Sequence, residues 1–150
     1  MTETSEVGGL PTTSKVLCAV YALIAVVASV ATWSQNVAYI DSGAQFVTAF
    51  WEDSKVNPAA RSVTVDLLLF GLPVLILMVA EARKHGIKFV WAYIAAGFLT
   101  AISIVFPLFL IARELRIART DPTRLRTADT VALTLLGLAI AAFVIWVDLV

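Results

Sequence analysis

One acidic side chain of this 150-residue chain stands inside an apolar stretch, where an ionisable group is costly to place. Asp66 lies in the stretch 63–80, which is otherwise uncharged. Inserting a charged residue into a membrane helix costs about 2.5–3.5 kcal/mol, so such a residue indicates a partner or a function. Arg113 ends a later apolar stretch, and we predict that its guanidinium pairs with the Asp66 carboxylate. The pair could be a structural latch between two helices or part of a substrate or ligand site.

Other polar side chains are expected at the same membrane face as this pair. Gln35 and Asn36 end the first apolar stretch, and Asn57 precedes the second. Glu114 follows Arg113, and Asp129 opens the last apolar stretch. With Asp66 and Arg113 they form the candidate polar site. A buried carboxylic acid that stays protonated could donate a proton to a lipophilic substrate there. No residue is assigned as catalytic.

Missing motifs exclude several other chemistries. The sequence has no Walker-type Gly-rich loop, HExxH, GxSxG or GxGxxG motif. The single histidine, His85, lies in a charged loop and the single cysteine, Cys18, in an apolar run, so we expect no metal site and no disulfide framework. Eleven basic and eleven acidic residues cancel, which does not favour nucleic acid as a partner. No cofactor is expected.

The apolar stretches that must position these groups are long enough to cross a membrane. Hydrophobic residues make up 60% of the chain and the mean hydropathy is +0.90, both above the values typical of soluble domains. The uncharged run 89–112 would form a helix of about 36 Å, longer than the roughly 30 Å hydrocarbon core, with a kink at Pro107. We predict an all-α integral membrane bundle, a single domain over 15–150, whose four transmembrane helices lie at about 16–33, 63–80, 89–112 and 130–148.

The remaining segments are short. Residues 1–14 are polar and small and predict a disordered tail. Residues 45–55 carry apolar side chains at helical spacing, which favours an interfacial amphipathic helix between the first and second spans. Asn57 followed by Pro58 is typical of a helix start. A cleaved signal peptide, with its apolar region at 16–27, is the alternative to a first span.

Four spans would place both chain ends on one side of the cell membrane. The opposite side would hold seven basic residues, two in 34–61 and five in 113–129, against four on the side of the chain ends, which are Lys15, Arg83, Lys84 and Lys88. The positive-inside rule then favours an N-terminus outside the cell. The expected partner is the lipid bilayer, and a lipophilic ligand, a membrane protein partner and a second copy of the chain all remain open.

A group of motifs between residues 46 and 115 is shared with a known family. The motifs are an aromatic loop with Phe46 and Phe50, then Asn57 and Asp66, a turn with Glu81, Arg83 and Gly86 before Trp91, and the run Pro107-Leu108-Phe109-Leu110 followed by Arg113-Glu114. In these features the chain, over roughly 16–115, resembles the DUF2834 family of small bacterial membrane proteins of unknown function. It departs from the family in having fewer basic residues before Gly86 and in its extra apolar helix after Leu115. The resemblance implies the membrane architecture and brings no reaction or ligand.

Three classes of function remain open on these grounds. The first is a non-enzymatic subunit, scaffold or lipid-binding component in which the polar pair is a latch. The second is a cyclase- or isomerase-like membrane enzyme that uses an acidic residue on a lipophilic substrate. The third is a transporter or channel subunit, although no inverted repeat is visible in the sequence.

Overall fold

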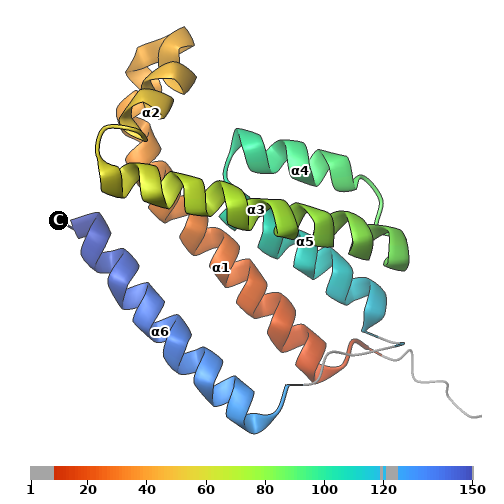
Figure 1. The fold of residues 1–150 in the computed structure, drawn as a ribbon. Coiled ribbons are helices and arrows are strands. Elements are labelled where there is room, and N and C mark those ends of the chain that lie inside the picture. Colours follow the sequence, from red (N-terminus) through yellow and green to blue (C-terminus); the bar gives the residue numbers. More distant parts are fainter. Residues whose placement is uncertain (1–8, 119, 121–124, 150) are drawn as a thin grey trace, which may run out of the picture.

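The protein is all-α, as predicted. The computed structural model describes residues 9–118, 120 and 125–149, and within these ranges the regular elements are helices. In chain order they are α1 (Thr12–Asn36), the 3-10 helix η1 (Val37–Gln45), α2 (Phe46–Asp53), α3 (Pro58–His85), α4 (Val90–Leu99), α5 (Ile102–Ile117) and α6 (Thr127–Leu149) (Figure 1). The predicted disordered tail lies outside the described residues up to position 8. Its last three residues, 12–14, already belong to α1.

Three helical segments among the described residues are long and apolar enough to cross a membrane. They are Thr12–Asp53, Pro58–His85 and Thr127–Val147, and the most apolar 18-residue windows within them have mean hydropathies of 2.3, 2.5 and 2.5. Only 6%, 11% and 0% of their most apolar windows are buried inside the protein. Long apolar helices that leave most side chains uncovered are suited to lipid rather than water, so they indicate an integral membrane bundle.

The predicted third span, 89–112, is two helices rather than one. The backbone leaves the helical conformation at Thr100 (φ −117°, ψ −80°) and becomes extended at Ala101 (φ −169°, ψ 143°). The hydroxyl of Thr100 donates to the carbonyl of Ala96 at 2.7 Å. Gly97 allows the close approach of the next helix, since a Cβ there would come within 3.2 Å of Ile102 Cδ1. Pro107, where the kink is predicted, lies inside α5 after the break.

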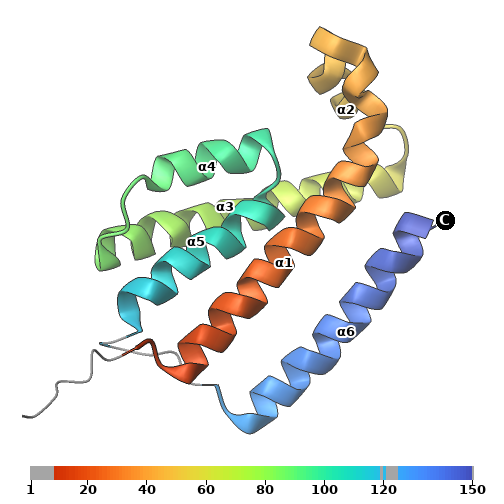
Figure 2. The same cartoon turned by 180° about the vertical axis from the view of Figure 1, so that it is seen from behind.

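This break turns α4 and α5 into a hairpin that returns to where it began. α4 departs from the end of α3, and α5 runs back toward that end while packing along α1 (Figures 1 and 2). α3 and α5 therefore end at the same end of the bundle, and α1 and α6 begin there. We call this the proximal end. The end of α1, together with η1, α2 and the start of α3, forms the distal end.

The apolar core lies between the second half of α3 and the hairpin. Met78 of α3 and Phe109 of α5 are fully buried, and the ring of Tyr93 from α4 meets Phe109 edge-on at 5.8 Å. Val74, Ala82, Ile87, Val90 and Ile94 complete this cluster. The core therefore fixes the positions of the α3–α4 turn and of the last turns of α5.

Local signals explain the helix boundaries. The Asn57 side chain accepts a hydrogen bond from the Ala60 amide at 2.8 Å with Pro58 at the first helical position, which confirms the predicted start. α6 begins at Thr127, where Asp129 accepts a hydrogen bond from the Arg126 amide at 3.2 Å. A helix, α2, is present where the interfacial helix is predicted, and its depth in the membrane stays a prediction.

Candidate polar site at the proximal end

The buried half of the bundle contains an ion pair between α3 and α5. Arg113 Nε donates a hydrogen bond to Glu81 Oε2, and the two side chains are 28% and 16% exposed. The predicted Asp66–Arg113 pair is therefore wrong. Asp66 precedes Glu81 by 81 − 66 = 15 residues on the same helix, about 22 Å along its axis. The prediction required 89–112 to cross the membrane once, whereas the reversal at Thr100 brings Arg113 back to the end of α3.

His85 approaches the same oxygen of the Glu81 carboxylate as Arg113 does. Its Nε2 is 3.4 Å from Glu81 Oε2, one helical turn along α3. This nitrogen is buried and makes no hydrogen bond within the part of the chain that the structure describes. A protonated His85 would add a second positive charge beside Glu81.

A second polar contact joins α1 to α5 at Glu114, the residue after Arg113. Ser14 Oγ donates to Glu114 Oε1 at 2.7 Å, and the two residues are 0% and 2% exposed. Glu114 is thus a fully buried acid at a helix interface. Together Ser14, Glu81, His85, Arg113 and Glu114 form what we call the proximal cluster.

The structure divides the seven candidate residues between the two ends. Arg113 and Glu114 belong to the proximal cluster, and Asp129 opens α6 at the same end. Gln35 and Asn36 end α1 at the distal end, where Asn57 and Asp66 lie near the start of α3 with exposed side chains. A single polar cup containing all seven is therefore not formed by this arrangement.

Sequence reasoning missed three members of the cluster. Glu81 and His85 read as a solvated loop because they adjoin Arg83 and Lys84, and Ser14 read as part of the tail. A usable signal for Ser14 was the Pro11 that precedes Thr12, since proline commonly stands at helix starts. Glu81 stands in the acid–basic–Gly turn of the family motifs, which marks it as a candidate, but its partner depends on where the later helix reverses.

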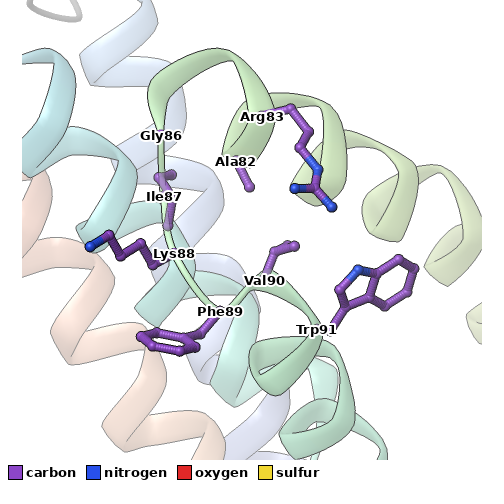
Figure 3. Close-up of a pocket in the computed structure, with 8 residues that line it drawn as sticks. All are labelled: Ala82, Arg83, Gly86, Ile87, Lys88, Phe89, Val90 and Trp91. Atoms are coloured by element: carbon purple, nitrogen blue, oxygen red, sulfur yellow. The ribbon is translucent and has the colours of Figure 1, made fainter.

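A cavity of about 380 Å³ lies beside the cluster, at the turn between α3 and α4 (Figure 3). Arg83 and Lys88 are its charged lining residues, and Phe89 and Trp91 its aromatic ones. None of the residues that line it is an acid. Among the described residues no group of His, Cys, Asp and Glu is arranged to hold a metal ion.

Two of the motifs that carry the family resemblance meet in this site. Glu81 belongs to the acid–basic–Gly turn and Arg113 to the run that ends in Arg-Glu, and the structure pairs them. No curated protein and no solved structure matches the chain. The family described as "Protein of unknown function DUF2834" matches residues 20–115, which include α3, α4 and most of α5 and leave out α6. With 115 − 20 + 1 = 96 of 150 residues matched, the chain belongs to the DUF2834 family.

Proposed function

We propose that this protein is a non-enzymatic membrane component, a small scaffold or subunit that contacts lipid, and that the Glu81–Arg113 pair latches α3 to the α4–α5 hairpin. The observation that carries the proposal is that both acids of the proximal cluster are bound by residues of other helices. Glu81 is held by Arg113 and Glu114 by Ser14, each from a different helix. Acids committed to inter-helix contacts hold helices together and have little freedom to protonate a substrate.

The cavity supports the same conclusion. A membrane enzyme of the proposed alternative kind needs an acid beside the pocket that receives its lipophilic substrate. The lining of the cavity at the α3–α4 turn is basic, aromatic and aliphatic instead. Asp66, the acid favoured for that chemistry, is exposed on α3 and does not line this cavity.

A double-mutant cycle tests the latch. Glu81→Gln and Arg113→Gln should each reduce the yield of folded protein in mild detergent, because each leaves a partly buried charge without its partner. The double variant should lose less folded protein than the sum of the two single losses. Monodisperse yield on size-exclusion chromatography is the measurement, and Arg116→Gln is the control because Arg116 is exposed and lies one turn beyond Arg113 on α5. Strictly additive losses would contradict the latch.

We also propose how the chain lies in the membrane. α1, α3 and α6 cross it, and the hairpin enters and leaves at the proximal end, since the ten residues of α4 span only about 15 Å. Of the described basic residues, seven lie at the proximal end, Lys15, Arg83, Lys84, Lys88, Arg113, Arg116 and Arg126, and two at the distal end, Lys55 and Arg61. The positive-inside rule then favours a cytoplasmic proximal end and N-terminus. The opposite expectation depended on placing 113–129 across the membrane from the tail.

A further inference from the structure

The turn between α3 and α4 combines positive charge with an unusual backbone. It opens with Gly86 (φ 65°) and closes with Phe89 (φ 61°), both in the left-handed region. Glycine adopts this conformation readily, whereas a phenylalanine there is strained. Phe89 nevertheless leaves 78% of its surface exposed, so the strain does not serve to bury its ring.

The basic side chains of this turn are available to a ligand. Glu81, the acid on the adjoining turn of α3, already accepts from Arg113. Arg83 and Lys88 line the cavity, and neither makes a hydrogen bond or ion pair with another residue of the described ranges. In Figure 3 the Arg83 guanidinium and the Trp91 indole extend to one side of the turn, with the indole nitrogen on the edge nearer Arg83, while Lys88 and Phe89 extend to the other.

Backbone donors at the start of α4 add to these groups. The first amides of a helix have no partner within it, and the helix dipole makes this end favourable for an anion. Val90 and Trp91 are the first residues of α4 and line the cavity, and the first helical bonds of α4 run from Ala92 and Tyr93 to the Phe89 carbonyl. The Arg83 guanidinium and the Trp91 indole N–H extend to the same side of the turn, and together they offer hydrogen-bond donors that suit a phosphate group.

The aromatic residues indicate where that phosphate comes from. Trp91 is 63% exposed and Phe89 is 78% exposed, on opposite sides of the turn, and aromatic rings at such positions favour the membrane–water interface. The turn directly follows an apolar helix long enough to cross the bilayer, so it reaches the depth of the lipid headgroups. We therefore propose that the cavity at the α3–α4 turn binds the phosphodiester of an anionic phospholipid, with Arg83 as its principal cation. This inference rests on the proposed membrane function.

Lipid binding to the full chain in detergent tests this proposal. Native mass spectrometry would compare retention of phosphatidylglycerol with that of phosphatidylcholine. The wild type should prefer phosphatidylglycerol, and Arg83→Gln should lose about tenfold of that preference, as expected for one charge-assisted hydrogen bond. Trp91→Phe, which keeps the ring and removes only the indole N–H, should lose a smaller share. Arg116→Gln is the matched control, because Arg116 is exposed at the same end and does not line the cavity.

Three results of this experiment would overturn the proposed lipid site. Equal losses in the Arg83 and Arg116 variants would overturn the site in favour of general charge attraction. Displacement of the lipid by millimolar inorganic phosphate would overturn the assignment to a lipid and leave a soluble anion as the ligand. A wild type without lipid preference, together with an intact Glu81–Arg113 coupling, would remove the lipid site alone and leave the proposed latch standing.

Discussion

At the scale of single residues, the structure places two acids of α3 in opposite surroundings. Asp66 and Glu81 both lie on α3, one near each end. Asp66 is exposed, and Glu81 is partly buried against Arg113. Because breaking a buried pair leaves an uncompensated charge, the two acids should respond very differently to neutralisation.

Asp66→Asn should leave the stability of the protein unchanged or raise it. The Asp66 side chain is exposed on an apolar helix, where an ionised carboxylate costs about 2.5–3.5 kcal/mol to insert, so the neutral amide is easier to place. Unfolding in detergent followed by tryptophan fluorescence measures this, and the same sample incubated with a lipid extract tests for lost turnover. Normal stability with loss of a wild-type turnover would favour the enzyme alternative over the scaffold.

Ser14→Ala should destabilise the protein by about 1–3 kcal/mol, because it removes a donor from a buried carboxylate. Ser34→Ala is the control, as the Ser34 hydroxyl is exposed and bonds only locally to the Ala31 carbonyl at 2.8 Å. If Ser14→Ala and Ser34→Ala unfold alike, the Ser14–Glu114 contact does not stabilise the α1–α5 interface.

At the scale of elements, the α4–α5 hairpin determines which polar groups meet. Its two helices share one uncharged stretch of sequence, and the reversal between them occupies only Thr100 and Ala101. Gly97 lets α5 approach α4 closely at that point. The hairpin therefore depends on a small side chain one turn before the reversal.

Gly97→Leu should destabilise the hairpin by about 1–3 kcal/mol through overpacking against Ile102. Gly71→Leu is a matched control, because a Cβ at Gly71 of α3 would have nothing within 4 Å. Leucine is a better helix former than glycine, so the control should be neutral or stabilising. Chemical unfolding of both variants in detergent gives the comparison, and equal stability of the two would show that α4 and α5 do not pack here.

At the scale of the whole molecule, the hairpin sets the number of crossings and therefore the side on which each loop lies. With three crossings the 81–88 turn and the end of α5 share a side, while four crossings separate them. This difference is measurable without any knowledge of the activity.

Single cysteines introduced on a Cys18→Ser background should distinguish the two topologies. A membrane-impermeant maleimide applied to intact cells should label Lys55→Cys, at the distal end, and should label Lys84→Cys and Arg116→Cys only after the membrane is permeabilised. If one of positions 84 and 116 is labelled from outside and the other only after permeabilisation, the two lie on opposite sides, as four crossings require. Labelling of both from outside would keep the hairpin and reverse the orientation.

The sequence by itself determined the helical class, the apolar segments, the cap at Asn57 and the family. These properties follow from composition and from interactions between residues close in the chain, so they can be read locally. Only the tertiary structure decided that Arg113 meets Glu81 rather than Asp66 and that Ser14 meets Glu114. Hydropathy measures how long a segment can remain in lipid, not whether its backbone continues straight, and a reversal of two residues at Thr100–Ala101 moved every later polar group to the other end of the bundle.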